Sequence, residues 1–143
     1  TKLGLAERLH LWLSDGFKGL PEGVRFDLLI SNPPYIPSAE ITTLEPEVRE
    51  FDPRQALDGG LDGLDHYHRL AQEAGGFLRP GGKIMLEFGD GQATALQVLL
   101  EEQNWIVERI SDDYNRRPRI MIARKNAGPT VEPNESPKPG GGV

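Results

Sequence analysis

The chain of 143 residues contains no cysteine, so disulfide bridges and thiolate metal sites are excluded. It has no apolar run close to the ~18 residues that indicate a membrane-spanning helix. Basic residues are few, because 16 Lys and Arg stand against 22 Asp and Glu and give a formal net charge of −6. A tight binder of nucleic-acid phosphates normally shows a basic face. The composition therefore argues against a disulfide framework, a membrane protein and direct nucleic-acid binding.

No metal site is expected from histidine either. His66 and His68 lie two residues apart on a predicted helix, so their side chains point about 200° apart around the helix axis. Such a pair cannot bind one ion together, and solvated or packed imidazoles are the favoured interpretation.

The apolar runs predict strands that alternate with helices, which indicates an α/β sheet. Strands are expected at residues 11–13, 26–31, 83–88, 105–111 and 119–124, and helices at residues 63–78 and at about 90–103, with Asp90 as the cap of the second. Residues 112–118 join the last two strands without a helix, which predicts an antiparallel hairpin. Residues 36–60 form a long, acidic loop that contains proline, and such loops are often functional.

Two regions of the chain differ in composition. Residues 1–125 have enough apolar side chains for one modest core and hardly for two domains. Residues 126–143 contain four prolines and three consecutive glycines with almost no apolar bulk, so we expect this tail to be disordered.

The most informative motif is the tetrapeptide Asn32-Pro33-Pro34-Tyr35, which directly follows the apolar run 26–31. Neither proline can donate a hydrogen bond to a sheet, so the pair ends the strand. The motif therefore lies at the carboxyl end of a buried strand, which is where open α/β sheets bind ligands. A Pro-Pro turn that closes the strand with a packed tyrosine is the alternative without a function.

These residues suit the recognition of a substrate –NH2 group. The side-chain oxygen of Asn32 and a nearby backbone carbonyl provide two acceptors for its two N–H donors. An amide or aromatic amine nitrogen is a poor nucleophile because its lone pair is delocalised. Two acceptors on its hydrogens would aim that lone pair at an electrophile, and Tyr35 could stack on a flat substrate group.

Asn-Pro-Pro-Tyr after an apolar strand resembles the signature of N-directed, S-adenosylmethionine-dependent methyltransferases, and the surrounding motifs narrow the resemblance. They are Glu45-Pro46-Glu47-Val48, Phe51-Asp52-Pro53-Arg54, Ala56-Leu57-Asp58-Gly59-Gly60, Leu78-Arg79-Pro80-Gly81-Gly82 and Leu86-Glu87-Phe88-Gly89. Together they resemble the release factor glutamine methyltransferases (the HemK/PrmC family) over about residues 1–125. The resemblance implies a cytoplasmic enzyme that methylates the glutamine of the Gly-Gly-Gln loop in peptide-chain release factors.

The resemblance also implies a Rossmann-like class I methyltransferase sheet with strand order 3-2-1-4-5-7-6. The chain is expected to hold strands 3 to 7 and to lack the glycine-rich cofactor loop, as the C-terminal part of a longer catalytic domain that is inactive alone. Strand 26–31 corresponds to strand 4 of this order. Without strand 1 beside it, it would be an exposed apolar edge. We therefore expect either self-association through residues 26–31 or a position of residues 11–13 unlike that in the family.

Site residues follow from the resemblance. It implies that Asn32, Pro33, Pro34 and Tyr35 form the catalytic and substrate-binding motif, with Asn32 also near the cofactor. It implies a cofactor contact for Asp15, whose carboxylate would accept the adenine amino group, with Gly16 and Phe17 along the ring. Gly89-Asp90-Gly91 superficially fits a cofactor loop but lacks the third glycine of that fingerprint.

Two other functions stay open at this point. An adenine-N6 nucleic-acid methyltransferase would also bind a flat –NH2 group, although the acidic charge and the motifs after Tyr35 count against it. A non-catalytic fragment that keeps only the fold is the third possibility. In the loop, Asp52, Arg54 and Asp58 are expected to tether the chain through hydrogen bonds, and Glu45, Glu47 and Glu50 to be mostly solvated.

Overall fold

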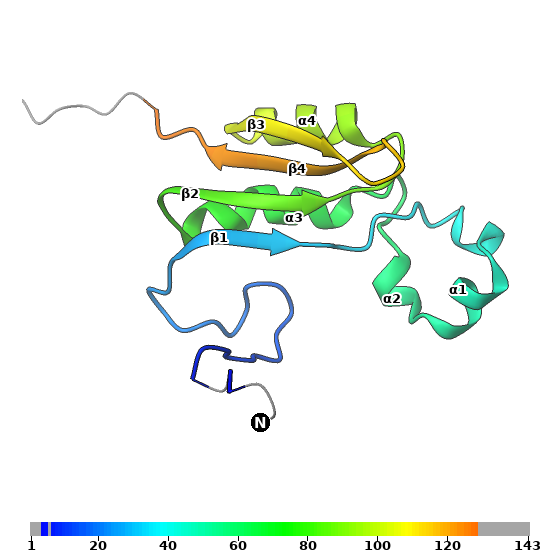
Figure 1. Cartoon of the computed structure of the whole chain (residues 1–143), viewed down its shortest axis with the longest axis horizontal. Helices are drawn as coiled ribbons and strands as arrows, with labels where there is room; N and C mark the ends of the chain where they lie inside the picture. Colours follow the sequence, from blue (N-terminus) through cyan, green and yellow to red (C-terminus); the bar gives the residue numbers. More distant parts are fainter. Residues whose placement is uncertain (1–3, 6, 129–143) are drawn as a thin grey trace, which may run out of the picture.

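The computed structural model describes residues 4, 5 and 7–128, which form a four-stranded sheet in the order β1-β2-β4-β3 (Figure 1). The strands are β1 (Phe26–Ser31), β2 (Leu78–Glu87), β3 (Trp105–Asp112) and β4 (Pro118–Lys125). β1 runs parallel to β2, whereas β4 is antiparallel to both β2 and β3. The predicted contiguous sheet and its hairpin at the end of the chain are therefore confirmed, in the order expected for strands 4, 5, 7 and 6.

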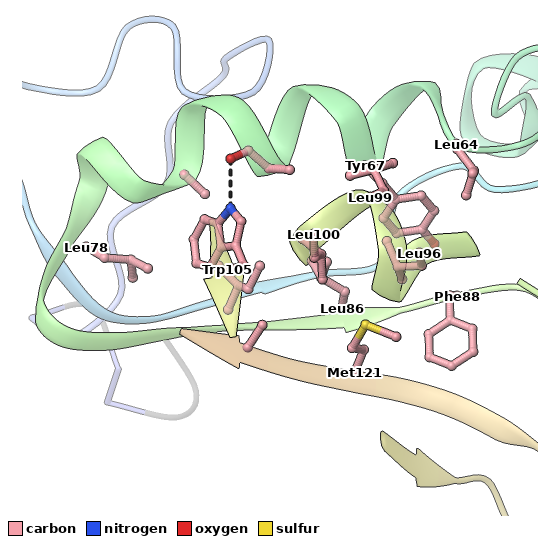
Figure 2. Close-up of a cluster of buried hydrophobic side chains, with 14 residues drawn as sticks. Leu64, Tyr67, Leu78, Leu86, Phe88, Leu96, Leu99, Leu100, Trp105 and Met121 are labelled. Atoms are coloured by element: carbon pink, nitrogen blue, oxygen red, sulfur yellow. Dashed lines mark hydrogen bonds between the residues drawn. The ribbon is translucent and has the colours of Figure 1, made fainter. Parts of the chain in front are cut away.

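One face of the sheet is covered by α3 (Asp65–Glu73), which continues into the 3-10 turn η2 (Ala74–Phe77), and by α4 (Ala93–Glu102). Figure 2 shows the apolar side chains that these helices press against the strands. One polar atom in this core is also paired, since the indole Nε1 of Trp105 donates to the carbonyl of Ala71 at 2.8 Å. The buried core consists of Leu64, Tyr67, Ala71, Ala74, Leu78, Ile84, Leu86, Phe88, Leu96, Leu99, Leu100, Trp105, Met121 and Ala123.

The strand expected at residues 11–13 is absent, so this prediction is wrong. Leu11, Trp12 and Leu13 have exposed fractions of 86%, 49% and 107%, and the described residues before β1 contain no strand. A strand needs a partner for its backbone hydrogen bonds. No neighbouring strand is offered to these three residues by the described part of the chain.

Two element boundaries also differ from the prediction. β2 begins at Leu78 rather than at residue 83, but its pairing with β1 jumps from Phe26↔Leu78 to Leu28↔Lys83. The Pro80-Gly81-Gly82 turn is therefore an irregularity inside the strand, and regular pairing starts where the strand was expected. Asp90 does not cap α4, because Gln92 precedes the helix while the Asp90 carboxylate lies 3.4 Å from Nη1 of Arg117.

The loop at residues 36–60 is an excursion that leaves the carboxyl end of β1 and projects beyond the sheet (Figure 1). It carries η1 (Ile41–Thr43), α1 (Pro46–Phe51) and α2 (Arg54–Leu57), which the sequence did not predict. Its two ends are joined by hydrogen bonds from Ile36 N to Leu57 O at 3.0 Å and from Gly59 N to Ile36 O at 2.9 Å.

The Asp58 carboxylate strengthens this junction. It accepts from Ser38 Oγ at 2.6 Å, from Gly60 N at 3.1 Å and from Arg54 Nε at 3.2 Å. The tethering roles expected for Asp58 and Arg54 are thus confirmed, whereas Asp52 makes no side-chain hydrogen bond to another described residue. The tail predicted to be disordered lies, from residue 129 onward, outside the described residues.

Candidate active site

The Asn-Pro-Pro-Tyr motif leaves the sheet at the carboxyl end of β1, as the sequence predicts, but the expected burial of this strand is wrong, because β1 is an edge strand with no buried residue. Ser31 still pairs with Leu86 of β2, and the chain then turns away through Asn32. Pro33 is buried, whereas Asn32 is exposed and its side chain makes no hydrogen bond to another described residue. The Asn32 amide oxygen is therefore free to accept a hydrogen bond from a ligand.

Beside this motif lies an open cavity of about 270 Å³ to which three separate segments contribute. The segment before β1 contributes the predicted cofactor residues Asp15, Gly16 and Phe17, and the motif contributes Pro33 and Pro34. The structure thus brings together two groups of residues that the sequence places 16 or more positions apart. The remaining lining residues are Ser14, Ser31, His66, Arg69, Leu70 and Glu73.

Asp15 is held in this wall by a residue that sequence reasoning missed. Nη1 of Arg69 donates to Asp15 Oδ1 at 2.7 Å, and Nη2 donates to the Asp15 backbone carbonyl at 2.8 Å. The Arg69 hydrogen bond, with smaller contributions from Lys18, lowers the pKa of the Asp15 carboxyl to about 2. Asp15 is therefore an ionised acceptor at neutral pH. Nothing in the sequence marks Arg69, because its partner lies 54 residues away.

The two residues after Asp15 shape the wall. Gly16 has a φ of +62°, and a Cβ atom there would lie 2.7 Å from Nη2 of Arg69. A side chain at this position would be strained by the positive φ and would displace the guanidinium. Phe17 stacks on Phe77, with ring centroids 4.6 Å apart and planes 10° apart, so Phe77 covers one face of its ring.

Tyr35 belongs to a different cavity. It lines a neighbouring hollow of about 390 Å³ together with Glu40, Asp62 and Asp90, and Asn32 lines neither hollow. The Tyr35 hydroxyl donates to Glu87 Oε1 at 3.4 Å. Burial, followed by the nearby Glu87 charge, raises the pKa of this hydroxyl. Tyr35, the last residue of the motif, therefore lines the second hollow and not the cavity that Asp15 lines.

The two histidines, His66 and His68, lie in different hollows. His66 lines the cavity of about 270 Å³, whereas His68 is exposed and lies in a groove against α4. Within the described ranges no group of three or more His, Asp and Glu side chains could hold a metal ion. None of the helices in those ranges is long and apolar enough to cross a membrane.

The cavity next to Asp15 fits the adenine end of the cofactor that the resemblance implies. Adenine offers an exocyclic N–H donor and a flat ring. The wall offers an ionised carboxylate at Asp15 and an aromatic side chain at Phe17.

No family model matches the chain, but several known proteins are similar to it in sequence. The release factor glutamine methyltransferase of Rhodospirillum rubrum is 48% identical over 108 residues, which cover 76% of this chain and 33% of that protein. The one from Geobacter sulfurreducens is 59% identical over 70% of this chain and 35% of its own length. The one from Caulobacter vibrioides is 45% identical over 96% of this chain and 45% of its own length.

The chain therefore spans between a third and a half of the length of these relatives. Among solved structures, the crystal structure of a methyltransferase from Pyrococcus furiosus matches 70% of this chain and 41% of that chain, with a TM-score of 0.47 and 20% identity. Identities of 45–59% across 70–96% of its residues show that the chain belongs, over the part it shares with them, to the release factor glutamine methyltransferase family.

Proposed function

We propose that the protein containing this chain transfers a methyl group from S-adenosylmethionine to a glutamine side-chain amide, in the Gly-Gly-Gln loop of a peptide-chain release factor. One observation carries the proposal. The Asn-Pro-Pro-Tyr motif stands at the carboxyl end of β1, beside the Asp15 cavity, in a chain 45–59% identical to relatives of that name. A reaction on release factors would take place in the cytoplasm.

In this proposal the substrate amide is bound by two acceptors of the motif. The side-chain oxygen of Asn32 and the carbonyl of Pro33 accept its two N–H groups. The absence of a competing hydrogen bond at Asn32 among the described residues supports this role. Holding both hydrogens draws the nitrogen towards a tetrahedral shape and aims its lone pair at the methyl group.

The cavity next to the motif is proposed to hold the adenosyl part of the cofactor. Asp15 would accept the adenine amino group, and Gly16 and Phe17 would lie along the ring. When bound, S-adenosylmethionine supplies an electrophilic methyl group on a sulfonium. The location of Pro33 and Pro34 in the same cavity wall supports transfer across a short distance.

Tyr35 is proposed to contact the substrate from the other side of the motif. Its ring lines the hollow of about 390 Å³ that adjoins the loop. No residue of the chain is required as a general base, because the methylated nitrogen can lose its proton to water.

The test is the Asn32→Ala variant of the full natural polypeptide. Loss of one preorganised acceptor should lower kcat by about 10²–10³-fold, with a much smaller effect on cofactor binding. The matched control is Asn126→Ala, because Asn126 is exposed just after β4, at the end of the sheet opposite to the motif. Methyl incorporation from labelled S-adenosylmethionine into a release factor gives kcat, and calorimetry gives cofactor affinity.

Near-normal turnover of the Asn32→Ala variant would remove Asn32 from the mechanism. Methylation of adenine in oligonucleotides, with none of release factor, would instead favour the nucleic-acid methyltransferase. Failure of the wild-type polypeptide to methylate either substrate would favour a non-catalytic protein that keeps only the fold.

A further inference from the structure

Gln92 has an unusual place and an unusual set of partners. It directly precedes α4, where a short polar side chain normally caps the first free N–H groups of the helix. The Gln92 side chain makes no such cap, and instead reaches back to the Asn-Pro-Pro-Tyr motif. The residue is half-buried, and its amide finds hydrogen-bond partners within the protein.

Both ends of the Gln92 amide are used. Nε2 donates to the Tyr35 carbonyl at 2.9 Å and makes a longer contact with the Gly63 carbonyl at 3.5 Å. Oε1 accepts from the backbone N–H of Gly89 at 2.8 Å. The side chain therefore joins the motif, the glycine turn before α3 and the turn after β2. A neutral primary amide is needed here because the site requires both a donor and an acceptor.

The two glycines around Gln92 make this arrangement possible. A Cβ atom at Gly63 would lie 2.2 Å from the Tyr35 carbonyl oxygen and 2.5 Å from Nε2 of Gln92. A Cβ atom at Gly89 would lie 2.8 Å from Oε1 of Gln92 and 2.9 Å from Cδ2 of Tyr35. The backbone thus approaches the amide so closely that Gln92 and Tyr35 have little room to shift.

Fixing Tyr35 also fixes the residues before it. Pro33 and Pro34 have φ angles restricted by their rings, and a residue followed by proline is restricted as well. Few free torsions therefore separate the Tyr35 carbonyl from Asn32. On the other side, β1 fixes Ser31 through its pairing with Leu86. The motif is held at one end by the sheet and at the other by Gln92.

We propose that Gln92 is the positioning residue of the Asn-Pro-Pro-Tyr motif, and that its hydrogen bond to the Tyr35 carbonyl aims the acceptors of Asn32 and Pro33 at the substrate nitrogen. This inference rests on the proposed methyl transfer. Gln92 acts through the loop and touches no reacting atom. A displacement of the acceptors by about 1 Å can cost as much as 10²-fold in rate, so such a restraint is large enough to measure.

The donor and the acceptor of the Gln92 amide can be tested separately. Gln92→Glu keeps the size of the side chain and the acceptor for Gly89, but it directs a carboxylate at the carbonyls of Tyr35 and Gly63. Gln92→Leu removes both the donor and the acceptor. The control is Gln72→Glu, the same change at an exposed position of α3 without a side-chain hydrogen bond to another described residue.

In the full natural polypeptide, kcat for release factor should fall about 10- to 10²-fold in both Gln92 variants, with KM for the cofactor unchanged. Amide hydrogen exchange should show that Gly89 stays protected in Gln92→Glu and loses protection in Gln92→Leu. The kcat ratio of Gln92→Glu to wild type should rise as pH falls, because protonation restores a donor to the Tyr35 carbonyl and the facing carbonyls raise the pKa of the new carboxyl.

Wild-type kcat in both Gln92 variants, at a temperature where each is folded, would overturn the positioning role. A ratio that stays constant with pH would do so as well. An inactive wild type would instead overturn the proposed function, so the two failures are distinguishable.

Discussion

The carboxylate of Asp15 carries two ionic contacts before any ligand is considered. Oδ1 accepts from Nη1 of Arg69 at 2.7 Å and Oδ2 accepts from Nζ of Lys18 at 2.9 Å. Each carboxylate oxygen has a second lone pair, so an adenine amino group could share the site with both cations. Arg69 also binds the Asp15 backbone carbonyl, so it fixes the direction of the residue as well as its charge.

Arg69→Gln should raise the pKa of the Asp15 carboxyl from about 2 towards 3.8, because the Arg69 hydrogen bond is the largest cause of its depression. Since the folded-state pKa lies below the unfolded value, stabilisation by Asp15 is fully present above about pH 4 and is lost as pH falls towards 2. Arg69→Gln should remove most of this pH dependence. NMR titration of the Asp15 side-chain carbon measures the midpoint.

Lys18→Gln serves as the matched control, and its effect should be smaller because Lys18 contributes less to the shift. An unchanged Asp15 midpoint in Arg69→Gln, or a larger change in Lys18→Gln, would contradict the assignment of Arg69.

At the scale of elements, regular hydrophobic runs were predictable and isolated ones were not. The strand at residues 26–31 pairs with β2 and the two hairpin strands pair with each other, and the structure has these three within one residue of the predicted bounds. The run at residues 11–13 has no partner in the described chain and stays irregular. The short helices α1 and α2 were missed because four to six residues show too little periodicity.

The candidate site was also predictable only where its residues have strong local effects. Its motif was visible in the sequence because proline and asparagine have strong local effects at the end of a strand. Its supports were not visible, since Arg69 and Gln92 act on residues 54 and 57 positions away. The sequence also could not show that Tyr35 lines a second hollow, because the partner of its hydroxyl, Glu87, lies 52 positions away.

The turn that joins the excursion to α3 gives a test at this scale. Gly63 has a φ of +78° and is buried against the Tyr35 carbonyl oxygen. Gly63→Ala should lower the free energy of unfolding by more than about 1 kcal/mol, because the new methyl group has no space and the backbone conformation disfavours it. Urea unfolding followed by circular dichroism measures the change.

Gly76→Ala is the control, since a Cβ atom at Gly76 meets nothing within 4 Å. This variant should be neutral or slightly more stable, by at most about 1 kcal/mol, because alanine restricts the unfolded chain. Equal stability of the two alanine variants would show that the close approach to Tyr35 is relieved without cost.

At the scale of the molecule, β1 stands at one end of the strand order with its outer edge unpaired by the described residues. Leu29 packs against the core beneath the helices, so Leu28 and Ile30 point to the other face of the sheet. Their exposed fractions are 44% and 69%. An unpaired edge that also displays apolar side chains is a template for pairing with another chain.

We expect the 143-residue chain to self-associate through residues 26–31, with a mass by light scattering that rises with concentration above the 15.8 kDa of the monomer. Ile30→Lys should shift the mass towards the monomer, because a lysine at an open edge disfavours pairing. Val98→Lys is the matched control, since Val98 has an exposed fraction of 48% but lies on α4, away from the edge. A wild-type chain that stays monomeric at every concentration, or an equal effect of the two lysines, would show that the β1 edge does not pair. The same edge lies next to the Asn-Pro-Pro-Tyr motif in sequence, so pairing there would also restrict access to the candidate active site.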